Sequence, residues 1–343
     1  MITVLLQIKM SLLITGRILI RQDAELMQIL MPDHSQHNTD TGRQDDMKDK
    51  LIKFCKSINI EHTGIAAAEP YFDFEQAWRS QIEKGHISGF EEKDVARRVY
   101  PGLTLADARS VIVCLFPYYQ GDSAGANLSK SARSIDYHLI VMNKLQAIAE
   151  FLSKNIENFH YKAFVDNGPF SDRYLAYKAG LGFWGINSQL ITDQYGSYVF
   201  IGYILNNYPF EPDEPQKRTC IQCFECVRRC PGKCIKGDFT INPLRCKSFL
   251  TQKKGVLTPD EEDIIKKHEL IWGCDVCQDV CPHNKNPRPT AIKEFTEDLL
   301  YSIDVEELRS ISGKEFKRRY GNRSFGWRGK GVLIRNHEII HGK

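Results

Sequence analysis

Apolar and polar residues repeat along the chain with two different periods, and these periods predict helices that alternate with strands. Apolar positions at helical spacing predict helices over 47–58, 71–84, 135–153, 171–179, 303–310 and 313–320. Apolar runs of strand length occupy 63–68, 110–116, 161–165 and 198–205. The run at 110–116 is almost wholly apolar, which is typical of a strand covered on both faces. Alternating strands and helices indicate an α/β or α+β architecture, and we expect the α+β class.

The first 46 residues lack the pattern of a folded element. Residues 2–20 look apolar, but Lys9 and Arg17 interrupt them before they reach the length that crosses a bilayer. No cleavage site or twin-arginine motif supports export, so we expect a cytoplasmic protein. Because residues 32–46 carry no hydrophobic period, we expect 1–46 to be a poorly ordered extension or a mis-assigned start. The first domain would then begin at Met47.

Length and composition are those of an ordinary globular protein with room for two domains. The formal net charge of +3 over 343 residues is too small to identify a partner. The eleven cysteines change this picture, because most of them have the spacing of metal ligands.

The stretch from Cys220 to Pro231 has the spacing C-x2-C-x2-C-x3-C-P, which bacterial ferredoxins use to bind iron–sulfur cubanes. In that pattern three thiolates bind one cubane, and the fourth cysteine belongs to a second cluster. The chain supplies the missing ligands further along. We therefore expect one [4Fe-4S] cluster on Cys220, Cys223, Cys226 and Cys281, and a second on Cys230, Cys246, Cys274 and Cys277.

Two other uses of these cysteines fit less well. Zinc sites usually pair two C-x2-C hooks or include histidine, and disulfides belong to exported proteins. Cys234 fits neither cluster set, and we expect it to be a small side chain of local packing. Cys55 and Cys114 lie in apolar runs and are expected in the core.

A second candidate site follows the strand predicted at 161–165. Asp166 stands at the C-terminal end of this strand, where a carboxylate suits acid–base chemistry. The sequence Asp-Asn-Gly-Pro also favours a tight turn, so a purely structural role of Asp166 stays open. The glycine-rich stretch 180–188 would let the backbone approach a large flat ligand. Asp136, Tyr137 and His138 lie at the start of the helix predicted at 135–153, where Asp136 could serve only as the N-cap.

Residues 47 to about 340 resemble the epoxyqueuosine reductases, cobalamin enzymes that make the last reduction in queuosine biosynthesis on tRNA. The resemblance rests on ordered motifs and not on the cysteines alone. These motifs are R-R-V-Y-P at 97–101, D-Y-H at 136–138, V-D-N-G at 165–168, D-R at 172–173, A-G-L-G-F at 179–183, Y-G-S-Y at 195–198, C-K-S-F-L-T-Q at 246–252 and G-C-D-V-C-Q at 273–278. The chain departs from the family at 133–135 and at Ile186, where a lysine is usual.

The resemblance implies a cobalamin-binding α/β domain over 47–210, a ferredoxin-like two-cluster domain over 211–290, and a basic helical segment over 291–343 that packs back on the body. It also implies that electrons pass from the clusters to base-off cobalamin, with Asp166 as proton donor to the departing oxygen. The cobalamin pocket would be lined by Arg98, Asp136, Tyr137, His138, Asp166 and Arg173. Its edge would be contacted more loosely by Asn187, Ser188, Gln189, Leu190, Ser248, Gln252 and Lys253.

Basic residues cluster in two segments. Ten lysines or arginines stand against two acids over 216–254, and seven stand against Glu315 over 314–330, where aromatic residues interleave. Clustered cations with aromatics are typical of RNA binding, although they could also balance the charge of the clusters. Together with the family resemblance, these segments lead us to expect tRNA carrying epoxyqueuosine as the substrate, an external low-potential electron donor, no membrane contact and a monomer.

Two other functions stay open at this point. A cobalamin enzyme similar to the reductive dehalogenases would use both kinds of cofactor and act on a small molecule. A plain electron carrier would need only the cluster domain and would leave residues 47–210 without a role.

Overall fold

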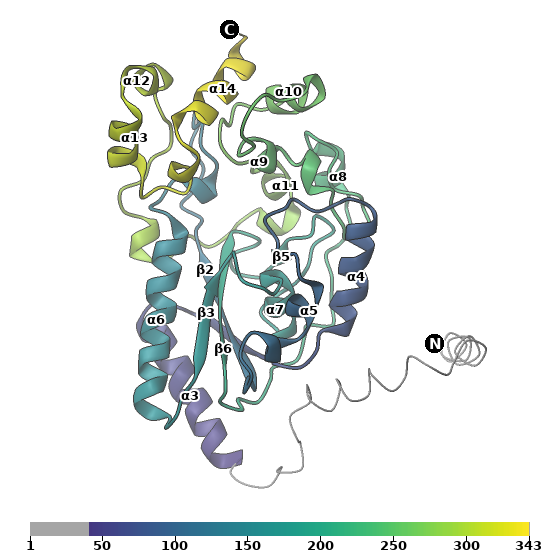
Figure 1. Ribbon diagram of the computed structural model, residues 1–343, viewed down its shortest axis with the longest axis vertical. Coiled ribbons are helices and arrows are strands. Elements are labelled where there is room, and N and C mark those ends of the chain that lie inside the picture. Colours follow the sequence, from purple (N-terminus) through teal and green to yellow (C-terminus); the bar gives the residue numbers. More distant parts are fainter. Residues whose placement is uncertain (1–40, 343) are drawn as a thin grey trace, which may run out of the picture. The chain divides into compact units, whose positions relative to one another are not determined.

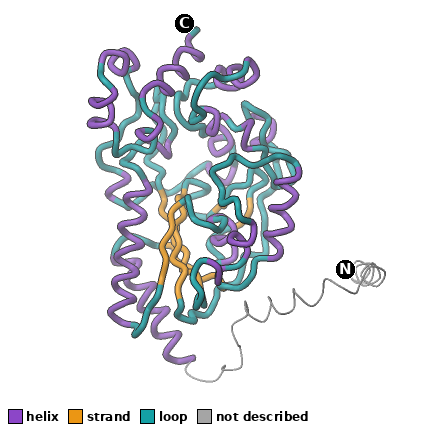
Figure 2. Tube along the Cα trace, viewed as in Figure 1, coloured by secondary structure: helices purple, strands orange, loops and turns teal. Residues whose placement is uncertain are grey.

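Four antiparallel strands form the central sheet, in the order β1-β2-β6-β3 (Figures 1 and 2). The computed structural model describes residues 41–342, and residues 1–40 and 343 lie outside this range. The strands are β1 (His62–Ala67), β2 (Ser110–Pro117), β3 (Tyr161–Val165) and β6 (Val199–Asn206). Each lies within one residue of an apolar run in the sequence, so these predictions are confirmed.

Helices cover both faces of the sheet (Figure 1). On one face lie α3 (Thr41–Ser57) and α6 (Tyr137–Asn155), and on the other lie α4 (Phe72–Glu83), α5 (Val95–Val99) and α7 (Asp172–Lys178). The predicted α+β class is confirmed, with a sheet that is antiparallel throughout.

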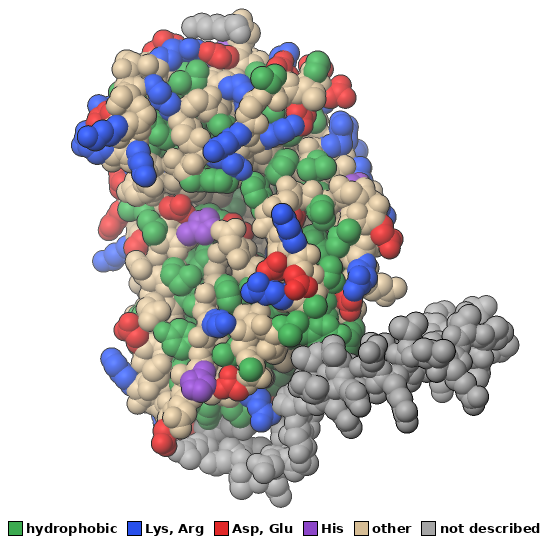
Figure 3. All heavy atoms as spheres, viewed as in Figure 1, with side chains coloured by type: hydrophobic (Ala, Val, Ile, Leu, Met, Phe, Trp, Pro, Cys, Tyr) green, Lys and Arg blue, Asp and Glu red, His purple; other side chains and the backbone are tan. Residues whose placement is uncertain are grey.

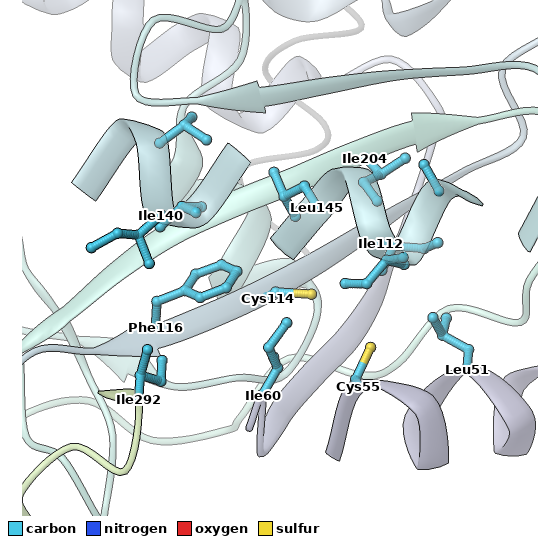
Figure 4. Close-up of a cluster of buried hydrophobic side chains, with 14 of the residues drawn as sticks. Leu51, Cys55, Ile60, Ile112, Cys114, Phe116, Ile140, Leu145, Ile204 and Ile292 are labelled. Atoms are coloured by element: carbon cyan, nitrogen blue, oxygen red, sulfur yellow. The ribbon is translucent and has the colours of Figure 1, made fainter. Parts of the chain in front are cut away.

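Side chains of β2 alternate between two apolar clusters, as the two-residue period of a strand requires. Ile112 and Phe116 join α3 and α6, as Figure 4 shows, whereas Val111 and Leu115 join α7 on the opposite face. All eight residues of β2 are buried, which explains why Ser110 is its one polar residue.

The remaining elements carry the cysteines and the C-terminus. The short strands β4 (Phe183–Trp184) and β5 (Leu190–Ile191) pair with each other. The helices are α8 (Glu225–Arg229), α9 (Lys247–Leu250), α10 (Pro259–Lys266), α11 (Val276–Asp279), α12 (Val305–Ser310), α13 (Gly313–Tyr320) and α14 (Lys330–His341). The last three pack in one apolar cluster with Leu128 and Trp272. No helix within residues 41–342 has the length and apolar character to cross a bilayer.

The helices differ from the prediction in two ways. The first helix begins at Thr41 and not at Met47, and its early residues were not predicted because they are polar and carry no apolar period. The sequence did not predict α5, α8, α9, α10, α11 and α14. For α10 a signal was present, since Thr258 and Glu261 form a capping box at its start. The borders predicted at 210 and 290 stay predictions, because the structure from Gly42 onward forms one unit.

We expect Leu145→Ala to lower the free energy of unfolding by about 2–5 kcal/mol, because Leu145 is fully buried between α6 and the sheet. Leu139→Ala is the matched control on the same helix. Its side chain is exposed, so the loss there should be within about 0.5 kcal/mol. Chemical denaturation followed by circular dichroism measures both, and equal losses would contradict the assignment of the core.

Candidate functional site

Asp166 directly follows the last residue of β3 and has a left-handed backbone, with φ of 61°. Few residues other than glycine adopt this conformation, although aspartate tolerates it better than most. Such conformations persist where the surrounding structure enforces them, often at functional sites. Here the tight turn is closed by a hydrogen bond from the Asn167 amide to the Val165 carbonyl at 2.7 Å.

The first turn of α6 meets the Asp166 carboxylate. The Tyr137 hydroxyl donates a hydrogen bond to Asp166 Oδ2 at 2.5 Å, and His138 Nε2 lies 3.5 Å from the same oxygen. The other nitrogen of His138, Nδ1, lies 2.7 Å from Asp136 Oδ1. Asp136 is also the N-cap of α6, because it accepts from the His138 amide at 3.0 Å. The capping role is therefore real, and the same carboxylate also orients the imidazole.

Charge in this group is distributed unevenly. Burial alone would lower the pKa of His138, but hydrogen bonds to Asp136 and Asp166 outweigh it and raise the pKa to about 9. Burial would raise the pKa of Asp166, but the hydrogen bonds from His138 and Tyr137 and the charge of Arg173 hold it below its usual value. At neutral pH the proton therefore resides on the imidazole and the aspartate is ionised.

The Asp166 side chain remains 57% exposed even though the surrounding protein desolvates it. The carboxylate therefore stays open to a ligand on its solvent side. Burial raises the pKa of the neighbouring Asp172 well above its usual value, and the charge of Asp166 adds to this shift. Asp172 Oδ1 is buried without a hydrogen-bond partner among the described residues. The spacing D-R marked Asp172 in the sequence, but sequence reasoning gave it no role of its own.

The two arginines predicted for this site lie in different surroundings. Arg173 is exposed and donates to the Ser188 carbonyl at 3.1 Å. Arg98 is buried, and its guanidinium lies 4.3 Å from the centre of the Trp78 ring. The charge of Asp172 acts on Arg98, so Arg98 belongs to the wall behind the carboxylates.

The residues predicted at the edge of the pocket fall into two groups. Asn187 and Ser188 contact the loops that carry the cysteines. The side-chain amide of Asn187 donates to the Cys277 carbonyl at 3.3 Å, and the Ser188 hydroxyl donates to the Phe239 carbonyl at 2.6 Å. Leu190 is buried in the apolar cluster that contains α7. The others make local contacts. The backbone N–H of Gln189 donates to the Asn187 side chain, and the side-chain amide of Gln252 donates to the Ser248 carbonyl. Lys253 forms an ion pair with Glu261.

The glycines of the stretch 180–188 serve packing within the chain, which differs from the expected approach to a ligand. A Cβ on Gly182 would lie 2.6 Å from the Ile191 carbonyl oxygen, and one on Gly185 would lie 2.4 Å from Asn187 Oδ1. Gly180 has φ of 68° and ends α7. The chain itself occupies the space that the missing side chains leave.

Four cysteines from distant parts of the sequence line one small cavity together with Gly185, Ile186 and Asn187. They are Cys220, Cys223, Cys226 and Cys281. The Ile186 amide donates to Cys220 Sγ at 3.2 Å, and burial raises the pKa of Cys226 to about 11, followed by the charge of Cys281. This set coincides with the one expected from the spacing.

The other four predicted ligands also lie within electrostatic reach of one another. Burial raises the pKa of Cys277 well above its usual value, and the charges of Cys274, Cys246 and Cys230 add to it in that order. Cys234 lies in the same place, with its sulfur 3.3 Å from Cys230 Sγ. None of the eleven cysteines is in a disulfide, and all of them belong to the described residues.

Many cations of the two basic segments are held by the protein itself. Lys247 is buried and donates to the Ile265 carbonyl at 2.7 Å, and Arg323 pairs with Asp298 at 2.7 Å. Arg328 is half-buried, and its guanidinium lies 3.7 Å from the centre of the exposed Trp327 ring. On the face drawn in Figure 3, lysines and arginines gather in the upper part, where α13 lies.

Two family models match the chain. One is described as a 4Fe-4S double cluster binding domain and matches residues 219–284. The other is described as "Epoxyqueuosine reductase QueG, DUF1730" and matches residues 98–167, which include Arg98, Asp136 and Asp166.

Named relatives cover most of the chain. The epoxyqueuosine reductase of Lactococcus garvieae (strain Lg2) is 34% identical over 299 residues, which are 84% of this chain and 85% of the relative. That of Bacillus subtilis (strain 168) is 35% identical over 84% of this chain and 77% of the relative.

Solved structures agree with the fold. A crystal structure of epoxyqueuosine reductase with an epoxyqueuosine-modified tRNA-Tyr stem loop matches with a TM-score of 0.80 and 32% identity, covering 87% of this chain and 81% of that one. The Bacillus subtilis enzyme with its catalytic aspartate loop swung out of the active site matches with a TM-score of 0.78 and 32% identity, covering 87% and 82%.

Proposed function

The chain belongs to the epoxyqueuosine reductase family, and we propose that it reduces epoxyqueuosine to queuosine in tRNA. The observation that carries the proposal is the group at the end of β3, where the half-exposed Asp166 carboxylate accepts from Tyr137 and lies 3.5 Å from His138 Nε2. Conversion of the epoxide to the alkene consumes two electrons and two protons and releases water. The protein must therefore supply both an electron route and a proton route to one place.

The cysteines fit the electron route. We propose that Cys220, Cys223, Cys226 and Cys281 bind one [4Fe-4S] cluster and that Cys230, Cys246, Cys274 and Cys277 bind the other. The match to a double-cluster domain supports two clusters, and free thiols in two converging sets have the donor chemistry that such clusters require. We also propose that 211–290 is the cluster domain, with 47–210 the catalytic domain.

The side chains around Asp166 suit a large polar cofactor with an apolar body. Asp172 Oδ1 lacks a partner among the described residues and can accept from an amide of the cofactor. Leu139 and Met142 follow on α6 with 52% and 37% of their surfaces exposed, an apolar area that a bound group would cover. When bound, cobalamin supplies the reducing chemistry at the substrate. We propose that Tyr137, His138 and Arg173 hold its rim and that residues 187–190 and 248–253 lie further out.

We propose that His138 passes its proton to the ionised Asp166, which delivers it to the departing oxygen, and that solvent supplies the second proton. Tyr137 fixes the carboxylate, and Asp136 fixes the imidazole so that the Nε2–H faces Asp166. An alkoxide is a poor leaving group, and a positioned acid can accelerate its departure by about 10²–10⁴-fold. The low pKa of Asp166 in the free protein is the reason for a second proton carrier.

Exposed aromatic side chains beside an arginine are suited to stack on unpaired bases of the tRNA. We propose that Arg328, Trp327 and Phe90 form a stacking surface for unpaired bases, because Trp327 and Phe90 are 56% and 47% exposed and lie edge to face. The enzyme would act as a monomer in the cytoplasm, where its tRNA substrate and a reduced electron donor occur together.

The test uses protein purified without oxygen and loaded with iron, sulfide and cobalamin. Incubation with epoxyqueuosine-containing tRNA and a chemical reductant should give queuosine, and omission of cobalamin should abolish it. Conversion of a halogenated aromatic compound without any conversion of the tRNA would support a dehalogenase instead. Protein that takes up no cobalamin would indicate a plain electron carrier.

Asp166→Asn should bind cobalamin normally and lose about 10²–10⁴-fold in turnover, because the amide cannot give up a proton to the leaving oxygen. Asp107→Asn is the matched control, since Asp107 forms a similar pair with His160 at 2.7 Å on the exposed surface. Single-turnover rates and cobalamin titrations measure both. Full activity of Asp166→Asn would contradict the assigned role.

Turnover should fall as the pH is raised through about 9, because His138 then loses the proton that Asp166 must receive. The raised pKa means that the proton is fully present at neutral pH and is lost only on the alkaline side. In His138→Asn this limb of the pH profile should disappear, together with most of the activity. His160→Asn should keep the limb, and a limb that survives in His138→Asn would assign it to another group.

Cys281→Ala should reduce the iron content by about half, because it removes one ligand of the cluster at Cys220, Cys223 and Cys226. Cys234→Ala is the control, since it removes a buried thiol beside Cys230 that is outside both proposed sets. It should retain both clusters by iron analysis and electron paramagnetic resonance. Unchanged iron in Cys281→Ala would show that the ligand sets are wrong.

A further inference from the structure

A cavity of about 710 Å³ opens beside Cys230. Its wall is built from both cysteine loops, because residues of α8 and of α11 line it together with Pro231. Tyr137, His138 and Asp166 do not line it, so it is separate from the Asp166 site. No step of the proposed reaction uses this cavity.

The rim of the cavity is positively charged. Its charged side chains are Arg228, Arg229, Lys233 and Lys267, against Glu225 and Asp279. Both acids already have partners, since Glu225 pairs with Arg228 and Arg229, and Asp279 pairs with the buried Lys130 at 2.7 Å.

Both lysines of this set are held in place by hydrogen bonds to the cysteine loop. Lys233 Nζ donates to the Arg228 carbonyl and Lys267 Nζ to the Pro231 carbonyl, each at 2.9 Å. The Arg229 side chain is 71% exposed. The cations therefore surround the place where Cys230 comes to the wall of the cavity.

We propose that this basic cavity is the docking site of a small acidic electron-transfer protein, which reduces the cluster held by Cys230. The proposal rests on the proposed function only for the presence of the clusters. Each docking event oxidises the carrier by one electron and reduces one cluster by one electron, so two events supply one epoxide. Electron tunnelling weakens exponentially with distance, and a carrier seated here would face a cluster ligand directly.

The character of the cavity favours a protein over other occupants. Pockets for small molecules carry few charged groups, whereas six of the eleven residues that line this cavity are charged. Redox partners associate through small, transient interfaces, and complementary charge steers their encounter. A tRNA phosphate is the competing occupant, and the experiment separates the two.

The test follows reduction of the clusters in the loaded enzyme without any tRNA, so it does not depend on epoxyqueuosine turnover. Fully reduced flavodoxin, an acidic one-electron donor, is mixed with the enzyme in a stopped-flow instrument, and its oxidation to the semiquinone is recorded. Dithionite reduction in parallel reports whether the clusters themselves are intact. The variant is Arg229→Glu with Lys267→Glu, and the matched control is Lys53→Glu with Lys154→Glu on exposed positions of α3 and α6.

We expect the rate constant for reduction by flavodoxin to fall about tenfold or more in the cavity variant, and to fall with added salt in the wild type. Dithionite reduction, the tRNA dissociation constant and the control variant should stay within about twofold of wild type. If the double glutamate variant loads iron poorly, Arg229→Gln with Lys267→Gln should show the same loss in smaller measure.

Reduction by flavodoxin at the wild-type rate in either cavity variant would overturn the proposal. An equal slowing with dithionite would place the effect on the cluster and not on docking, and would overturn it as well. Loss of tRNA affinity with unchanged reduction by flavodoxin would assign the cavity to the nucleic acid.

Discussion

The turn from Gly185 to Ser188 joins the loops that carry the cysteines to the part of the protein that contains Asp166. The Ile186 amide donates to Cys220 Sγ, and the Asn187 side chain donates to the Cys277 carbonyl, so one turn contacts loops from both cysteine sets. The Ser188 carbonyl accepts from Arg173, which follows Asp172 at the start of α7. Ile186 and Asn187 are 3% exposed, and few alternative positions are open to them. The departure from the family at Ile186 thus falls on a buried side chain among the cysteines.

The sheet fixes the position of Asp166. β3 ends at Val165, and a left-handed residue follows it, so the Asp166 carboxylate turns towards the start of α6. There the Asp136 cap, the imidazole and the tyrosine hydroxyl meet it. In the proposed reaction, the proton-transfer group and the cluster ligands lie on the two sides of one buried turn. Asp166, which is ionised at rest, would receive its proton from His138 before it gives that proton up.

The sequence predicted the elements that depend on local pattern. The sheet strands appeared as apolar runs because both of their faces are buried, and the cysteine sets followed from ligand spacing. It could not show that the glycines of 180–185 serve packing, because that depends on Ile191 and Asn187 folding back over them. Nor could it show that Arg98 is stacked on Trp78, or that Lys233 and Lys267 meet beside Cys230. Those contacts join segments far apart in the chain.

Our central claim is that the two cysteine sets and Asp166 belong to one active site, which receives its electrons through the clusters. Anomalous diffraction from crystals of the loaded protein, at the iron and cobalt absorption edges, tests it most directly. The account predicts two separate iron peaks, one within each cysteine set, and one cobalt peak facing the Asp166 carboxylate. A single iron peak, or cobalt bound away from Asp166 and Tyr137, would contradict it.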